Sequence, residues 1–335
     1  MTKQKENISK LQALTIGNAV VDTNIVSTTF NKHNLHMDLK HPISNLSISV
    51  GGGALNAAAT LAKLHFKTYP VCALGDDHYA TFVAKQLAEK NIEIGALVAK
   101  KTGSHQSTII SIPGQEEPLI FSYKNPHLFL DALDIPVSLV KESSLLYIAS
   151  FEINSLSAVD AALSAVSPKC KIAFNPSSQI IEHKIAQVEH FLEKAHIIFM
   201  NQHEAELYMQ KKNKPWNLHT FFNLVSSGKS KTVVLTLGKN GVHVLHENNL
   251  YSHPSISGSP VNTIGAGDAF NACFSGLLIQ GYDVKTALLY GLYNSNSVIR
   301  QQTAQAGILS LEELKTHSAT LNQLSISQMK YHFIF

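Results

Sequence analysis

The chain has 335 residues, of which 44% are hydrophobic and 15% are charged, and its formal net charge is +3. This is the composition of a globular protein with a sizeable core, and so mild a charge, without a run of five basic residues, argues against a nucleic-acid-binding protein. The sequence has no run of eighteen apolar residues and its first twelve residues are mainly polar, so we expect no membrane span, no signal peptide and a cytoplasmic location.

The first part of the chain mixes short strands with two helices. A β-branched apolar run over 13–21 predicts a buried strand that ends at Asp22, and the polar residues after it predict irregular structure up to about residue 45. Helices are expected directly after Gly53 and over 79–90. Further strands are expected at 45–50, 71–74, 107–112 and 118–123, the last two around a Pro-Gly turn.

From residue 145 onward, strands and helices alternate, which is typical of βαβ units and a largely parallel sheet. The expected strands are 145–149, 171–174, 196–200, 232–237 and 241–245, and the expected helices include 157–166 and 182–194. The segments 23–50 and 107–123 break this rhythm. We expect them to form a small β lid, with 1–22, 51–106 and 124–335 as an α/β core that binds nucleotide and substrate.

The most informative motif is NTIGAGDAF at 262–270, where a loop of small residues opens a helix. Because Gly265, Ala266 and Gly267 carry almost no side chain, an anion can approach backbone N–H groups at the positive end of the helix dipole. Asp268, beside them, could accept a proton from an attacking hydroxyl. The alternative is that the small residues only permit close helix packing and Asp268 only favours the helix start.

A second glycine-rich turn, Gly51 to Gly53, also joins a strand to a helix. A dinucleotide-binding fingerprint would need glycine at position 56, where Asn56 stands, so an NAD-dependent dehydrogenase is disfavoured. A polar side chain one turn into the helix suits the recognition of hydroxyl groups. The alternative is a tight turn packed on the sheet.

A third motif, Asn201-Gln202-His203-Glu204, follows a predicted strand directly. Ligands of open α/β sheets bind beyond the carboxyl ends of the strands, and a carboxylate there could orient hydrated Mg²⁺. The alternative is a helix cap followed by an exposed glutamate.

Together these segments resemble the ribokinase-like (PfkB-type) family of carbohydrate and nucleoside kinases. The resemblance covers most of the chain, and its motifs occur in the family's order. They are GNAVVD at 17–22, GGGALN at 51–56, LGDD at 74–77, NQHE at 201–204, TLGKNG at 236–241 and NTIGAGDAF at 262–270.

The resemblance implies a three-layer α/β/α core with a mostly parallel central sheet and a small β lid. It implies transfer of the ATP γ-phosphoryl group to a hydroxyl of a small sugar, with Mg²⁺ as cofactor. Asp268 would be the base, and Gly265, Ala266 and Gly267 would form the anion hole. The residues implied to hold acceptor hydroxyls are Asp22, Gly52, Gly53 and Asn56. Those implied to bind ATP are Asn201, Glu204, Thr236, Gly238, Gly241 and Asn294, with Glu204 also holding Mg²⁺ through water.

Two departures concern a monovalent cation that many family members hold beside the anion hole. The family pattern usually has Asp where this chain has Asn262, and often has Gly-Ala where this chain has Thr303-Ala304. Asn262 and Ile264 are the positions that the resemblance assigns to that cation. The departures put potassium activation in doubt and leave Asp268 untouched.

Two other functions stay open at this point. The acceptor could be a nucleoside such as adenosine, since Phe121, Tyr123 or Phe129 could stack on a base. The chain could instead be a catalytically weak sugar- or nucleotide-binding regulator, which Asn262 alone supports; the retained Asp268 argues against it, because a binder needs no base. The exposed edges of a lid sheet could also pair two copies into a homodimer.

Overall fold

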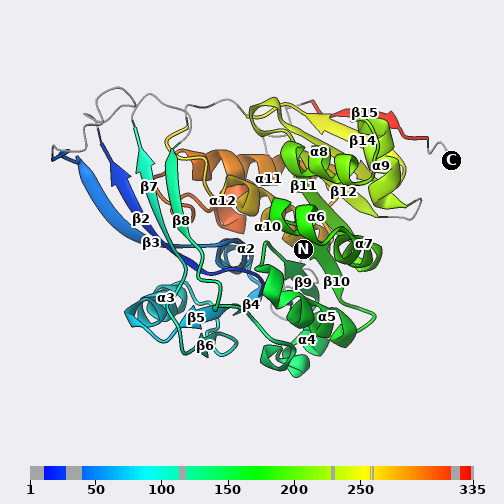
Figure 1. Cartoon of the computed structure of the whole chain (residues 1–335). Coiled ribbons are helices and arrows are strands. Elements are labelled where there is room, and N and C mark those ends of the chain that lie inside the picture. Colours follow the sequence, from blue (N-terminus) through cyan, green and yellow to red (C-terminus); the bar gives the residue numbers. More distant parts are fainter. Residues whose placement is uncertain are drawn as a thin grey trace.

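The computed structural model describes residues 11–27, 40–112, 118–227, 231–256, 258, 260–317 and 325–332. A nine-stranded sheet lies between two layers of helices, and a four-stranded sheet extends from one side of this core (Figure 1). This is the three-layer α/β/α architecture with a smaller second sheet that the sequence predicts. Within the described residues, no helix is both long and apolar enough to cross a membrane.

The large sheet has the strand order β15-β14-β13-β12-β11-β10-β9-β1-β4. Its strands are β1 (Gln12–Ile16), β4 (Lys67–Val71), β9 (Leu145–Ile148), β10 (Lys171–Phe174), β11 (Ile197–Asn201), β12 (Thr232–Thr236), β13 (Val242–His246), β14 (Asn249–His253) and β15 (Ser327–Lys330). Pairing is parallel from β4 to β12 and antiparallel from β12 to β15. All four residues of β9 are buried, as expected for a strand that is covered on both faces.

Two groups of helices cover the two faces of this sheet (Figure 1). One face carries α4 (Val137–Glu142), α5 (Leu156–Ala165), α6 (Ser178–His183), α7 (Ile185–Lys194), α8 (Gln202–Lys211) and α9 (Leu218–Ser226). The other carries α2 (Gly53–Lys63), α10 (Ala266–Ile279), α11 (Val284–Ile299) and α12 (Leu311–Thr316). The helix α3 (His78–Glu89) lies beside a two-stranded sheet of β5 (Ala73–Gly75) and β6 (Val98–Lys100). Short 3-10 turns occur at Ala132–Asp134, Ile153–Ser155 and Gly238–Asn240.

The smaller sheet has the order β3-β2-β7-β8, with β2 (Val20–Val26), β3 (Asn45–Gly51), β7 (Gln106–Ser111) and β8 (Leu119–Tyr123). Residues paired directly across strands lie on the same face of a sheet. One face therefore carries Asp22 with its partners Ser49 and Ser107, and the opposite face carries Ile48 and Phe121. The two faces thus differ in polarity, one rich in hydroxyl, amide and carboxylate groups and the other apolar.

The structure corrects several predicted boundaries. The run 13–21 forms two strands rather than one, because the chain turns at Gly17 and passes from the large sheet into the small one. The run 71–74 is likewise split between β4 and β5. The predicted helix 182–194 is two helices, since Lys184 has the non-helical backbone angles φ −138° and ψ 45°.

The small sheet also begins earlier than the sequence suggests. Its first strand starts at Val20, so Asp22 lies within this sheet and not at the end of a core strand, and residues 23–26 are a strand where irregular structure is expected. The rest of the predicted irregular stretch falls mainly on 28–39, outside the described residues. The division into a core and a mobile lid stays a prediction.

Candidate active site

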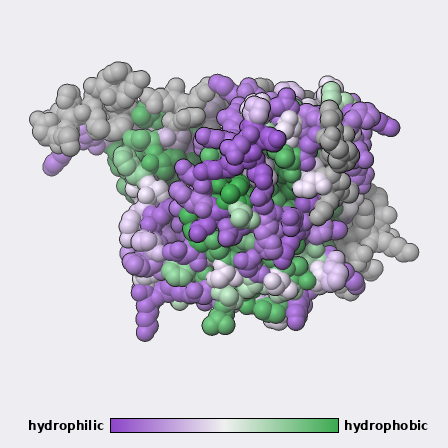
Figure 2. All heavy atoms as spheres, turned by 45° about the vertical axis from the view of Figure 1, so that its right-hand side comes forward, coloured by the Kyte–Doolittle hydropathy of each residue, from purple (hydrophilic) through white to green (hydrophobic). Residues whose placement is uncertain are grey.

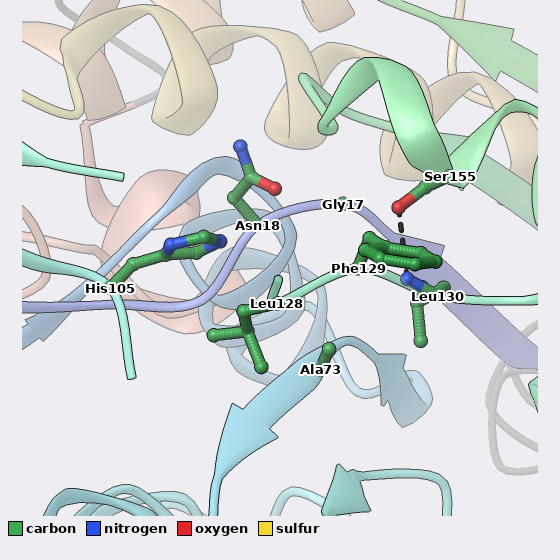
Figure 3. Close-up of a pocket in the computed structure, with 8 residues that line it drawn as sticks. All are labelled: Gly17, Asn18, Ala73, His105, Leu128, Phe129, Leu130 and Ser155. Carbon is green, nitrogen blue, oxygen red and sulfur yellow. Dashed lines mark hydrogen bonds between the residues drawn. The ribbon is translucent and has the colours of Figure 1, made fainter. Parts of the chain in front are cut away.

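Polar residues, two of them predicted from the sequence, lie at the carboxyl edge of the parallel strands, where open α/β sheets bind ligands. Asn18 follows β1, Asn175 follows β10, and Asn201 and Thr236 end the paired strands β11 and β12. Figure 3 shows a small hollow at the β1 end of this edge, with Asn18 and His105 on one side and Phe129 on the other. The residues that line it are Gly17, Asn18, Ala73, His105, Leu128, Phe129, Leu130 and Ser155.

The first turn of α10 is built to leave backbone N–H groups open. Its N-cap is Gly265, which has φ 80° and no side chain that could cap the helix. A methyl group on Gly265 would come within 2.5 Å of the Ala304 Cβ atom, so only glycine fits there. The N–H groups of Gly267 and Asp268 have no hydrogen-bond partner in the described part of the chain, whereas that of Ala266 bonds Thr263 at 3.3 Å. A methyl on Gly267 would meet nothing within 4 Å.

Asp268 faces Asn56 across the two helix starts of α10 and α2. The Asn56 Nδ2 atom donates to Asp268 Oδ2 at 2.9 Å, and Asp268 Oδ1 lies beside Gly53. Burial raises the pKa of the Asp268 carboxyl, while the hydrogen bond from Asn56 lowers it. The predicted base is therefore held in one orientation next to the open N–H groups.

Asn56 has capacity left for a ligand. It is 3% exposed, and its Oδ1 atom accepts from Gln305 Nε2 at 3.1 Å. An asparagine amide can make four hydrogen bonds, and these two contacts use one donor and one acceptor position. The predicted contact with an acceptor hydroxyl stays a prediction that this geometry allows.

The predicted acceptor residues Asp22, Gly52 and Gly53 surround the same turn. Asp22 is 6% exposed, and burial raises its pKa to about 7 against a weaker, opposing hydrogen bond from Ser107. Gly52 has φ 94°, and a methyl there would come within 2.3 Å of the Asn18 carbonyl oxygen. The backbone therefore approaches closely here, and only glycine permits it.

Asn201 and Glu204 form a reciprocal capping box at the start of α8. Glu204 N–H donates to Asn201 Oδ1 and Asn201 N–H donates to Glu204 Oε2, both at 2.9 Å. Burial raises the pKa of Glu204 to about 7, and the bond from Asn201 opposes this. The helix-cap alternative is thus present in the structure, and it uses only one of the two carboxylate oxygens.

The neighbourhood of Glu204 fits a hydrated magnesium ion. Its Oε1 atom has no hydrogen-bond donor among the described residues, and Asn175 Nδ2 lies 3.5 Å from Oε2. Asn271 Nδ2 donates to Asn175 Oδ1 at 3.2 Å, and the buried Asn271 Oδ1 has no partner within the described chain. Oxygen atoms of this kind are what Mg²⁺ and its waters prefer. Glu204 is the residue that would hold such an ion.

Thr236 ends β12, and Gly238 and Gly241 lie on the turn that follows it. Gly238 and Gly241 have φ 56° and 98°, and a methyl on Gly241 would come within 2.1 Å of the His253 carbonyl oxygen. Asn294 is different, because it is completely buried and its amide is engaged at both ends, by Ala269 at 3.0 Å and by Leu309 at 2.9 Å. This position suits a tie between α10 and α11 better than direct contact with ATP.

At the expected cation position, the side chain of Asn262 is already engaged by the protein. Asn262 Oδ1 accepts from the N–H of Ile264 at 3.0 Å, and Nδ2 donates to the carbonyl oxygen of Gln302 at 2.9 Å. Asn262 carries no charge, is 2% exposed, and joins the two loops by hydrogen bonds. Thr303 lies in the second of these loops. Potassium dependence stays a question for experiment.

The profile of the pfkB family of carbohydrate kinases matches residues 11–310, which is most of the chain. The chain belongs to this family. It is accordingly a sugar or nucleoside kinase, a phosphotransferase that acts on a hydroxyl group.

Individual relatives of this kinase are distant in sequence and close in structure. The ATP-dependent 6-phosphofructokinase of Thermoanaerobacterium thermosaccharolyticum is 24% identical, over 92% of this chain and 94% of that protein. The 5-dehydro-2-deoxygluconokinase of Shouchella clausii is 25% identical, over 79% and 85%. A putative ribokinase II of E. coli, solved with ATP and Mg²⁺, has a TM-score of 0.77 at 16% identity and covers 93% of this chain and 99% of that one. That likeness shows the shared fold.

Three polar residues join this site that sequence reasoning missed: Asn175, Asn271 and Gln305. Asn175 follows the predicted strand 171–174 and precedes a proline, and this position at the end of a strand could have indicated a site residue. Asn271 lies one turn after Asp268 on the same helix, a spacing that places side chains on one face. Gln305 is 249 residues from the Asn56 it contacts, and nothing local in the sequence indicates that contact.

Proposed function

We propose that this kinase transfers the γ-phosphoryl group of ATP to a hydroxyl group of a small sugar, with Asp268 as the general base. The observation that carries the proposal is the start of α10, where a carboxylate fixed by Asn56 lies next to the N–H groups of Gly267 and Asp268, which no residue in the described part of the chain caps. Such a pair of features suits proton removal and stabilisation of a transferring anion at one place.

The proposed phosphoryl transfer is an in-line displacement at the γ-phosphorus of ATP. Asp268 takes the proton of the acceptor hydroxyl, the hydroxyl oxygen bonds to the γ-phosphorus, and the bond from that phosphorus to the ADP oxygen breaks with its electron pair on ADP. The N–H groups of Gly267 and Asp268 would receive the charge of the transferring group. Magnesium, when bound near Glu204, supplies charge neutralisation for the ATP phosphates.

A sugar is the favoured acceptor because of the polar face of the small sheet. Asp22, Asn24, Ser49 and Ser107 share this face by their strand register, and Asn24 Nδ2 donates to Ser49 Oγ at 2.8 Å. Hydroxyl, amide and carboxylate groups of this kind match the hydroxyls of a sugar.

The aromatic residues of β8 give a nucleoside less support. Phe121 pairs with Thr108 and Tyr123 with Gln106, so both lie on the face opposite Asp22. Phe129, in contrast, lines the hollow beside Asn18 (Figure 3). Its ring is the one observation that keeps a nucleoside as a second candidate acceptor.

The test is an ATP-to-ADP turnover assay with Mg²⁺ and a panel of pentoses, hexoses, sugar acids, sugar phosphates and nucleosides. We expect strong stimulation by one sugar or sugar derivative, and phosphate transfer confirmed by mass spectrometry of the product. Stimulation only by nucleosides, together with loss of that activity in Phe129→Leu, would select the second candidate. Turnover that no acceptor stimulates would contradict both.

The apolar face of the small sheet supports the expected homodimer, with a second copy of this chain as its occupant. Leu46, Ile48, Phe121 and Tyr123 lie on this face and are 50 to 58% exposed. Figure 2 shows apolar side chains gathered on this side of the molecule. Contiguous exposed apolar surface marks an interaction site more often than scattered residues do. Sedimentation velocity should show a dimer that Phe121→Glu dissociates and Leu133→Glu, at an isolated position 99% exposed, does not.

A further inference from the structure

A chain of hydrogen bonds leads from the surface of α3 to the proposed base. Lys90 Nζ, at the carboxyl end of α3, donates to Gln305 Oε1. Gln305 Nε2 donates to Asn56 Oδ1 at 3.1 Å, and Asn56 Nδ2 donates to Asp268 Oδ2 at 2.9 Å. The four residues come from α3, the segment after α11, α2 and α10, so tertiary folding alone brings them together.

The direction of this chain is fixed at both ends. An ammonium group can only donate and an ionised carboxylate can only accept, so each amide between them has one orientation that satisfies both neighbours. If the side-chain amide of Gln305 were turned by 180°, its carbonyl oxygen would face Asn56 Oδ1 and its NH₂ group would face the Lys90 ammonium, and neither pair could form a hydrogen bond. The positive charge of Lys90 and the negative charge of Asp268 therefore favour the same orientation, in which Asn56 presents its NH₂ group to Asp268.

The hydrogen bond from Asn56 also determines which carboxylate oxygen of Asp268 is left to react. Since Asn56 bonds Asp268 Oδ2, the other oxygen, Oδ1, is turned to the side of Gly53, where the second glycine-rich turn lies. A carboxylate without this donor could rotate, and in buried surroundings its pKa would rise further.

We infer that Gln305 and Lys90 are positioning residues of the reaction, which hold the Asn56 amide so that it orients the Asp268 carboxylate and keeps it ionised. This inference rests on the proposed function of Asp268. Neither residue touches the reacting atoms; each acts through Asn56.

Other ionisable groups near the chain do not replace this role. Among the described residues, Tyr147 on β9 and Glu204 on α8 interact electrostatically with Asp268, whose negative charge helps to raise the pKa of both groups. Burial lowers the pKa of the Lys90 ammonium group, Glu89 opposes this shift and Lys63 adds to it. Asn56 thus supplies the hydrogen bond that favours the ionised base.

The sharpest test is Gln305→Glu, which keeps the shape and the contact with Lys90 but removes the donor to Asn56. Asn56 should then turn its NH₂ group towards the new carboxylate and its oxygen towards Asp268. We expect the acid limb of the kcat/KM profile to move up by about one pH unit, equal to about a tenfold loss at the acid side, with KM for ATP unchanged. Activity should recover towards the wild-type value at alkaline pH.

Lys90 provides a second, independent variant. Lys90→Met removes the ammonium group that begins the series of hydrogen bonds. It should move the acid limb of the profile in the same direction by a smaller amount, whereas Lys90→Arg should keep the wild-type position of that limb. Lys85→Met, at an exposed position of the same helix, is the matched control and should leave the profile in place. All variants should first be compared by thermal unfolding, because a purely structural role would lower stability without moving the pH profile.

The outcomes separate this inference from the proposed function. If Asp268→Asn abolishes turnover while Gln305→Glu and Lys90→Met keep the wild-type acid limb, the positioning role is wrong and the base assignment stands. If Asp268→Asn turns over normally, the base assignment itself is wrong, whatever the other variants do. If Gln305→Glu does not fold, the Lys90→Met and Lys90→Arg pair decides.

Discussion

The first turns of α8 and α10 both begin at the carboxyl edge of the large sheet, and each carries one carboxylate whose pKa is raised by burial. They differ in how they use their backbone N–H groups. In α8, Asn201 and Glu204 cap the helix with their own side chains. In α10, Gly265 has no side chain, and the N–H groups of Gly267 and Asp268 have no partner within the described residues.

This difference teaches where an anion can bind in the fold. The capping box of α8 occupies the N–H groups of Asn201 and Glu204 and places carboxylate and amide oxygen atoms at this helix start, which suit a hydrated cation. An uncapped start offers donors and the positive end of the helix dipole, which suit a phosphoryl group. On the proposed assignment, the same sheet edge would hold the cation near Glu204 and the transferring anion at the start of α10.

The largest expected effect separates the two carboxylates. Asp268→Asn should lower kcat by about 10² to 10⁴-fold, because an amide cannot accept the acceptor's proton, while ATP binding persists. Steady-state turnover with isothermal titration of ATP measures both quantities. Asp160→Asn, at a half-exposed position on α5, is the control. An equal loss of kcat in Glu204→Gln, with normal turnover in Asp268→Asn, would reverse the assigned roles.

The next effect tests whether the open N–H groups of α10 meet a ligand. A methyl group on Gly267 would touch none of the described residues within 4 Å, so Gly267→Ala should fold with wild-type stability. If the phosphoryl group approaches the backbone there, kcat/KM should fall by roughly tenfold to a hundredfold. Gly95→Ala, where a methyl also meets nothing, is the matched control and should keep full activity. Unchanged turnover in Gly267→Ala would place the anion elsewhere.

A smaller effect concerns how each helix start is held in place. The α8 start is held by its own capping box, whereas the α10 loop is tied to a neighbouring loop by Asn262 and Gln302. We expect turnover that is the same in sodium and in potassium salts. Asn262→Asp loses the donor to Gln302, so thermal unfolding in sodium should show a loss of stability of about 1 kcal/mol. Strong stimulation of the unmodified protein by potassium would show that a cation binds there in spite of the hydrogen bonds of Asn262.

The smallest effect is on stability and its pH dependence. The folded-state pKa of Glu204, about 7, lies above its ordinary 4.5, so the folded protein binds more protons and loses stability as pH rises between these values. Glu204→Gln keeps the capping box without this titration. Because the side chain is half-buried, we expect a gain of only about 1 kcal/mol over the wild type at pH 8 and none at pH 4. Thermal unfolding without Mg²⁺ measures it, and equal differences at both pH values would exclude the raised pKa.

The sequence by itself determined the elements that depend on local pattern. The alternation of strands and helices predicted the parallel core. The glycine-rich turns predicted the starts of α2 and α10, because only glycine readily adopts positive φ angles and lets another backbone come so close. It could not divide 13–21 or 71–74 between two sheets, since a continuous apolar run looks the same whether or not the chain turns within it.

Only the tertiary structure decided which groups act on the base. Asn56 was expected to face an acceptor, and the fold also turns its amide towards Asp268, 212 residues away. Gln305 and Lys90 carry no local pattern, because their contacts join four separate elements. Hydrogen bonds between distant side chains depend on how helices pack, and packing is a property of the whole chain rather than of any segment.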